Sequence, residues 1–144
     1  MLVPRPRAEV FDFFAAAENL ERITPRELGF EIATPPPIEM AVGTLIEYRL
    51  RLFGVPFRWL TRISRWEPGV AFVDEQVKGP YALWVHTHTF RDAEGGTLVS
   101  DEVRYRLPLF PLGEAALPLV RLQLRRIFAY RSRRLGELLG PLSR

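Results

Sequence analysis

The two histidines of this chain, His86 and His88, lie two residues apart within the segment WVHTHTF at residues 84–90. An imidazole can exchange protons near neutral pH, bind a metal ion or orient a polar ligand group. Side chains at positions i and i+2 of a strand point to the same face of a sheet. We therefore expect the two rings to lie side by side, as metal ligands, acid/base groups, polar anchors of a pocket or hydrogen-bonded core residues.

A carboxylate is expected opposite these rings, on the strand that follows. If the two strands are joined by a four-residue loop, Asp92 to Gly95, then His86 faces Asp101 and His88 faces Val99. A slip of one residue would turn the whole apolar set of the second strand toward water, which disfavours it. The predicted cluster is therefore His86, His88 and Asp101.

The strand that precedes the histidines leaves two orientations open. One set of alternate residues carries Asp74 and Gln76, and the other carries Val73 and Glu75. Either set can be reached through a hairpin at Gly79-Pro80. We favour the first, which would add Asp74 and Gln76 to the polar cluster.

The elements that must position these side chains follow from periodicity. Helices are expected at residues 6–15 and 19–25, and strands at residues 28–34, 44–53, 55–66, 70–77, 81–91 and 97–107. Short connections between long strands predict an antiparallel meander. Apolar residues spaced by three, four or seven positions then predict a long amphipathic helix that ends near residue 139. The fold class is α+β, with this helix laid across a curved sheet and a gap between them that suits a small molecule.

Composition narrows the classes further. The chain has 144 residues, no cysteine and a net charge of +3, so we expect one domain, residues 1–144, without disulfides or thiolate chemistry. No apolar run is long enough to span a bilayer and the first residues lack a signal-peptide core, so we expect a cytoplasmic protein without stable membrane insertion. Lys78 is the single lysine among twenty basic residues, a composition found in thermophiles.

A cluster of arginines near the C-terminus could suggest nucleic-acid binding, but charge runs on helices are usually solvated. We expect a solvated helix face and no nucleic-acid partner. The cluster consists of Arg121, Arg125, Arg126, Arg131, Arg133 and Arg134.

The motif GPYALWVHTHTF (79–90), followed by GGTLVSDEVRY (95–105), resembles the START-like superfamily, also described as polyketide cyclase/dehydrase-like or SRPBCC. AEVFDFFAAAENLERITP (8–25) resembles its opening helix pair, and the small stand-alone bacterial members are the nearest in pattern. The resemblance implies a helix-grip fold, in which a seven-stranded antiparallel sheet wraps around the C-terminal helix and encloses a cavity. Only residues 1–4 remain for the first strand, so we expect a truncated edge strand. Functions in the superfamily are diverse, so the fold alone implies little beyond binding an apolar molecule.

We therefore predict a non-catalytic binder of a small hydrophobic or aromatic ligand, a monomer or homodimer that needs no cofactor. Polar contacts are expected from four of its residues: His86, His88, Asp101 and Gln76. Apolar walls are expected from Trp84, Phe90, Tyr105, Tyr48, Phe57 and Trp59.

Two alternatives remain open. The first is an aromatase/cyclase- or dehydratase-type enzyme, in which a His86–Asp101 pair transfers protons. No nucleophile, oxyanion loop or cofactor motif accompanies that pair. The second is a metal site at His86, His88 and Asp101, because His-x-His places both rings on one side of a strand, about 7 Å apart.

Overall fold

In the computed structural model, which describes residues 1–140, seven strands form one antiparallel sheet in the order β1-β7-β6-β5-β4-β3-β2. The strands are β1 (Leu2–Val3), β2 (Glu31–Ile32), β3 (Leu45–Leu52), β4 (Val55–Glu67), β5 (Ala71–Lys78), β6 (Leu83–Ala93) and β7 (Gly96–Arg106). The central five follow one another as a meander, as the short connections predicted. The edge strand β1 has only two residues, and the expectation of a truncated first strand is confirmed.

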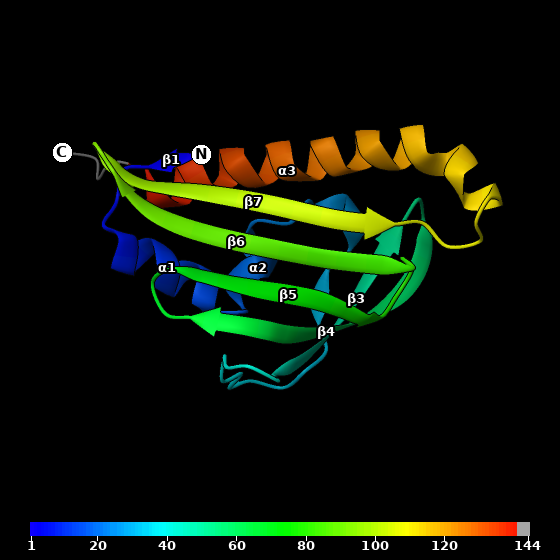
Figure 1. Ribbon diagram of the computed structural model, residues 1–144, viewed down its shortest axis with the longest axis horizontal. Coiled ribbons are helices and arrows are strands. Elements are labelled where there is room, and N and C mark those ends of the chain that lie inside the picture. Colours follow the sequence, from blue (N-terminus) through cyan, green and yellow to red (C-terminus); the bar gives the residue numbers. More distant parts are fainter. Residues whose placement is uncertain (141–144) are drawn as a thin grey trace.

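The long C-terminal helix α3 (Leu117–Leu139) runs along the sheet beside β7 and contacts β1 (Figure 1). The remaining helical segments are α1 (Arg7–Ala15), α2 (Asn19–Arg22) and the 3-10 turns η1 (Arg26–Leu28) and η2 (Leu112–Ala116). Helix α1 packs against β6 and β7. The expected α+β helix-grip class is confirmed. Within residues 1–140, no helix combines the length and apolar character needed to cross a bilayer.

The strand expected at residues 28–34 is mostly wrong. Leu28 ends the turn η1, and Gly29 adopts a left-handed backbone conformation with φ 53°, which interrupts any extended segment. Only Glu31 and Ile32 pair with β3. Sequence alternation overestimated this strand because the turn before it is not visible in the apolar pattern.

Alternation does predict which face of β3 is buried. Ile46, Tyr48 and Leu50 are all buried, and they join Trp59 of β4 in one apolar cluster beneath α3. Strand β3 turns into β4 through Phe53-Gly54, both with positive φ, a backbone that favours a tight two-residue hairpin.

The register predicted between β6 and β7 is wrong by two residues. His88 lies opposite Asp101, and His86 lies opposite Val103. The connection is a two-residue turn rather than a four-residue loop, because Ala93 pairs with Gly96 and Gly95 takes a positive φ of 84°. A shift of two residues preserves the face of every side chain, so the inward set of β7 is the one predicted.

Candidate functional site

A cavity of about 160 Å³ lies between the inner face of the sheet, the α1–α2 segment and α3. Its walls are mainly apolar, and they include the rings of Tyr48, Trp59, Trp84 and Phe128. Trp59 and Trp84 meet edge to face with ring centroids 5.1 Å apart, which gives that wall a fixed shape.

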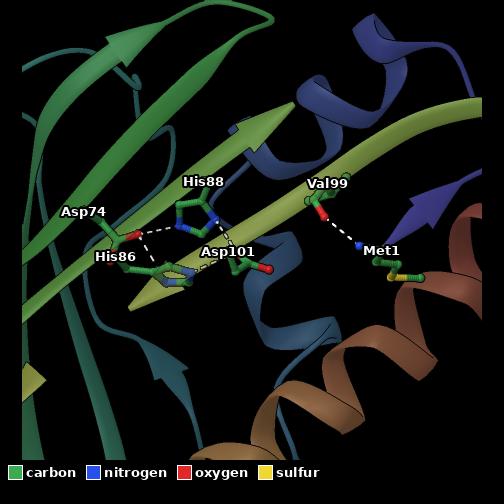
Figure 2. Close-up of polar contacts among 6 residues, drawn as sticks. All are labelled: Met1, Asp74, His86, His88, Val99 and Asp101. Atoms are coloured by element: carbon green, nitrogen blue, oxygen red, sulfur yellow. Dashed lines mark hydrogen bonds and ion pairs between the residues drawn. The ribbon is translucent and has the colours of Figure 1, made fainter. Parts of the chain in front are cut away.

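The two histidines form part of the cavity wall, and both are buried with 4% and 5% of their surface exposed. Their ring centroids are 3.8 Å apart. His86 Nε2 lies 2.9 Å from Asp101 Oδ1, and His88 Nε2 lies 2.7 Å from Asp74 Oδ2. Figure 2 shows the four side chains converging from β5, β6 and β7. We call His86, His88, Asp74 and Asp101 the polar quartet.

Asp74 reaches the quartet because β5 pairs with β6 so that Asp74 faces His86 and Phe72 faces His88. The Phe72 ring stacks on the His88 ring at a centroid distance of 4.1 Å. The structure therefore places β5 in the orientation that we favoured. Gln76 shares that orientation but not the site, since its amide bonds both the N–H and the C=O of Tyr81.

Each imidazole of the quartet has a different proton affinity. Burial, reinforced by the neighbouring His88, lowers the pKa of His86 to about 4. Burial also opposes the charged form of His88, but the contacts with Asp101 and Asp74 outweigh it and raise the pKa of His88 above its ordinary value. These directions favour the protonated form at His88 and the neutral form at His86.

The carboxylates respond in the opposite direction. Burial alone would raise their pKa values, but the adjacent imidazoles hold the pKa of Asp74 and that of Asp101 below the usual range. With His86 neutral, its Nε2–H donates to Asp101, and His88 Nε2–H donates to Asp74. His88 Nδ1 lies 3.1 Å from Asp101 Oδ1, close enough for charge attraction, although the direction does not suit a hydrogen bond. The quartet is largely satisfied by its own members.

The other residues predicted to bind a ligand divide into two groups. Tyr48, Trp59 and Trp84 line the cavity. Asp101, Tyr105, Phe90, Gln76 and Phe57 are absent from its walls.

Two of the predicted wall residues belong to other packing. Phe90 is 1% exposed and packs in a separate core cluster against Phe11, with ring centroids 5.2 Å apart. Tyr105 packs edge to face on Tyr81. Both lie on the predicted face, but alternation cannot distinguish a residue buried in a solid core from one that borders a cavity.

Arg131 is the residue of the cavity wall that sequence reasoning assigned wrongly. We expected it on a solvated helix face, but it is 9% exposed and borders the cavity. Its guanidinium carbon lies 5.1 Å from the Phe128 ring centroid. The spacing contained the signal, because Arg131 falls three residues after Phe128 and four before the buried Leu135, on the apolar stripe of α3.

The quartet contains the donor atoms of a possible metal site. The nearest ligand atoms of Asp74, His86 and His88 lie within 4.8 Å of one another, so Asp74 replaces Asp101 in the compact set. Metal ligation requires neutral imidazoles, whereas the pKa of His88 is raised and its Nε2 lies at hydrogen-bond distance from Asp74. The arrangement fits a closed hydrogen-bond network better than a coordination sphere.

A family model described as "Domain of unknown function (DUF8410)" matches residues 27–139. The chain belongs to this family. The match includes the whole polar quartet and Arg131, and it begins after α1 and α2. No curated protein matches the chain.

Solved structures with low sequence identity share the fold of this DUF8410 member. TTHA0849 from Thermus thermophilus is 20% identical, with a TM-score of 0.71 over 95% of this chain and 91% of that one. CV1439 from Chromobacterium violaceum is 15% identical, with a TM-score of 0.71 over 98% and 94%. Ginseng major latex-like protein 151 from Panax ginseng is 13% identical, with a TM-score of 0.64 over 98% and 94%. These likenesses support the START-like resemblance at the level of the fold.

Proposed function

We propose that this protein binds a small, mainly apolar molecule in the cavity between the sheet and α3. The observation that carries the proposal is the cavity itself, a space of about 160 Å³ walled by aromatic rings and bordered by buried polar groups. A hollow of this composition inside an otherwise packed domain is the usual form of a ligand site. The resemblance to small stand-alone bacterial START-like proteins points to the same role.

The cavity volume limits the size of the ligand. An apolar cavity of about 150 Å³ accepts a benzene-sized molecule, so the expected ligand has roughly one aromatic ring or a short branched chain. Trp59 and Trp84 would contact it directly, while three members of the quartet, Asp74, His86 and His88, border one side.

Native mass spectrometry of protein purified from its own host, with metal analysis of the same sample, tests the proposal. A retained organic mass at one equivalent is the expected result. Stoichiometric zinc or iron would instead support the metal alternative. Titration with benzene-sized aromatics, followed by the fluorescence of Trp59 and Trp84, provides a second test in which quenching that saturates at one equivalent is expected. An unchanged spectrum across the series would contradict a ligand of this size.

An acid/base enzyme of cyclase or dehydratase type is the second candidate, and the His86–Asp101 contact of 2.9 Å favours it. The pKa of about 4 weakens it, since a general base works best when its pKa lies near the operating pH. The pKa of His88 is raised, and both of its ring nitrogens lie within 3.1 Å of a carboxylate oxygen. The quartet therefore supports binding better than proton transfer. Turnover of aromatic polyketide-like compounds that disappears in His86→Gln would reverse this order.

A further inference from the structure

Arg131 is a buried basic residue of the cavity wall, and its hydrogen bonding within residues 1–140 is incomplete. It is 9% exposed, and its Nε is enclosed without any hydrogen-bond partner. Within residues 1–140, no carboxylate lies close enough to Arg131 to form an ion pair, and no side-chain hydrogen bond of its guanidinium is present. Its neighbour Arg134 shows the contrast, since it pairs with Glu137 and donates to the carbonyl of Arg22.

A guanidinium cannot lose its proton to relieve such burial, because arginine stays charged at every physiological pH. Its planar fork of donors matches a carboxylate, to which it can donate two parallel hydrogen bonds. The Phe128 ring beneath the guanidinium stabilises the cation and holds it in place, but a ring accepts no in-plane N–H bond. Arg131 is therefore charged and held at the cavity wall, and its side-chain donors have no acceptor within residues 1–140.

We propose that the ligand of this cavity carries a carboxylate that pairs with Arg131, so that the natural ligand is a small aromatic or branched aliphatic acid. This inference rests on the proposed binding function and names the chemical class of its ligand. The apolar body of the acid would lie against Trp59 and Trp84, and its carboxylate would point toward α3.

Asp74 also borders the cavity, and its negative charge would repel an acid if it were free. Its Oδ2 is held by His88 Nε2 at 2.7 Å and lies 3.8 Å from His86 Nδ1. Asp74 therefore bonds His88 rather than Arg131, which leaves the N–H donors of Arg131 for the ligand. The limited space and the nearby carboxylate favour a single negative charge, so the inference is a carboxylate rather than a phosphate.

Matched pairs of acids and amides test the inference with the full chain. Benzoate and phenylacetate are titrated by calorimetry at pH 7 beside benzamide and phenylacetamide, which share their shape but lack the charge. We expect each acid to bind at least about tenfold more tightly than its amide, because charge-assisted hydrogen bonds are the stronger class. Equal affinity for the two classes would overturn the inference and leave the proposed function standing. Binding of neither class would overturn both.

Substitutions on α3 test whether Arg131 is the source of the preference for acids over amides. Arg131→Gln should reduce the ratio of acid to amide affinity to near one while leaving amide affinity within about twofold. Arg133→Gln is the control, since Arg133 is exposed on α3 and also lies over an aromatic ring, that of Tyr130 at 5.2 Å. Its ratio should equal that of the unchanged protein. A ratio that survives in Arg131→Gln would contradict the inference. If that variant does not fold, the ratio measured in the unchanged protein still decides, and Arg131→Lys, which keeps the charge but loses the fork, should lower it in part.

Discussion

The two polar regions that border the cavity are built in different ways. On the sheet, the polar quartet brings two carboxylates and two imidazoles together, and each carboxylate meets an imidazole nitrogen at 2.9 Å or less. On α3, Arg131 is 9% exposed and has neither an ion pair nor a side-chain hydrogen-bond partner within residues 1–140. The contacts within the quartet account for its burial without a ligand, apart from His88 Nδ1, which has no hydrogen-bond partner within residues 1–140. Arg131 is not explained by folding.

Charge balance connects the two regions at a distance. Within the quartet, the lowered pKa values of Asp74 and Asp101 favour the carboxylates and the raised pKa of His88 favours its imidazolium, while Arg131 adds a positive charge from the helix. Arg131 contributes to the lowered pKa of Asp74, although less than the two histidines do. Long-range attraction thus offsets the charge of Arg131 but leaves its donors without acceptors. The comparison predicts that the quartet controls stability and that Arg131 controls ligand choice.

The largest expected effect comes from opening the quartet. Asp74→Ala removes the acceptor of the His88 bond and leaves a buried ring nitrogen without its hydrogen-bond partner. We expect the free energy of unfolding to fall by about 4 kcal/mol, the scale found when one member of a buried ion pair is removed. Urea denaturation followed by circular dichroism measures it.

Glu75→Ala is the matched control on the same strand. Glu75 pairs with Arg62 at 3.4 Å on the outer face, where such pairs contribute less than about 1 kcal/mol. Similar losses of unfolding free energy in the two variants would mean that the quartet stabilises the fold no more than a surface ion pair. That result would contradict the assignment of stability to the quartet and ligand choice to Arg131.

The next largest effect comes from changing the pH, and we expect the free energy of unfolding to be greatest near pH 6.5. As the pH falls from 6.5 to 4, the unfolded chain protonates His86 while the folded protein does not, so stability should decrease by about 3 kcal/mol. The raised pKa of His88 acts in the other direction, because its contribution is complete below pH 6.5 and is lost as the pH rises through the folded pKa. Below pH 3.8 the lowered pKa values of Asp74 and Asp101 add a further loss as the pH falls.

Denaturation across pH 4 to 8 checks this curve, and His86→Gln isolates its acid limb. Glutamine can still donate to Asp101 but does not titrate, so the slope between pH 6.5 and 4 should become much shallower. Stability that stays level or increases over that range in the unchanged protein would mean that His86 is not held neutral.

Gln76 tests on a smaller scale whether a hydrogen-bonded polar side chain away from the cavity affects the stability of the fold and not ligand affinity. Gln76→Ala removes two hydrogen bonds to the backbone of Tyr81, and we expect a loss of about 2 kcal/mol. The affinity for benzoate should be unchanged, since Gln76 does not border the cavity. Lys78→Ala, exposed at the end of the same strand, is the control. A tenfold loss of benzoate affinity in Gln76→Ala would restore the ligand role that the sequence suggested.

The sequence predicted which side chains of a strand face inward better than it predicted which residues pair across neighbouring strands. Strand periodicity is strict, so alternation alone placed His86, His88 and Asp101 on one face and made Asp74 the favoured addition. The register between β6 and β7 depends on the backbone of the turn, and the positive φ of Gly95 is not encoded in the apolar pattern. The error was tolerable because a shift of two residues keeps each side chain on its face.

The role of Arg131 was missed for a different reason. Arginine is usually solvated, so residue type suggested the surface, whereas its position between Phe128 and Leu135 on the helix indicated the interior. Phe90 and Tyr105 show the converse limit, because an apolar side chain on the inward face can equally border a cavity or fill a core. Whether three-dimensional packing leaves a space depends on side chains from every element, and a single strand does not encode it.

The smallest effect has the opposite sign, and it separates the two regions most sharply. Arg131→Met replaces the unpartnered cation by an apolar chain of similar length that can pack on Phe128. Because a buried donor without a partner is unfavourable, we expect the free energy of unfolding without ligand to increase by about 1 kcal/mol, measured by urea denaturation. Arg133→Met, on the exposed face, should change it by less than about 0.5 kcal/mol. A decrease of more than about 1 kcal/mol in Arg131→Met would show that Arg131 supports the fold by holding Asp74, which would make it a fifth member of the quartet rather than its counterpart. Asp74 and Arg131 border the same cavity with opposite charges. If the quartet stabilises the fold and Arg131 serves the ligand, Asp74→Ala should lower the free energy of unfolding and Arg131→Met should raise it.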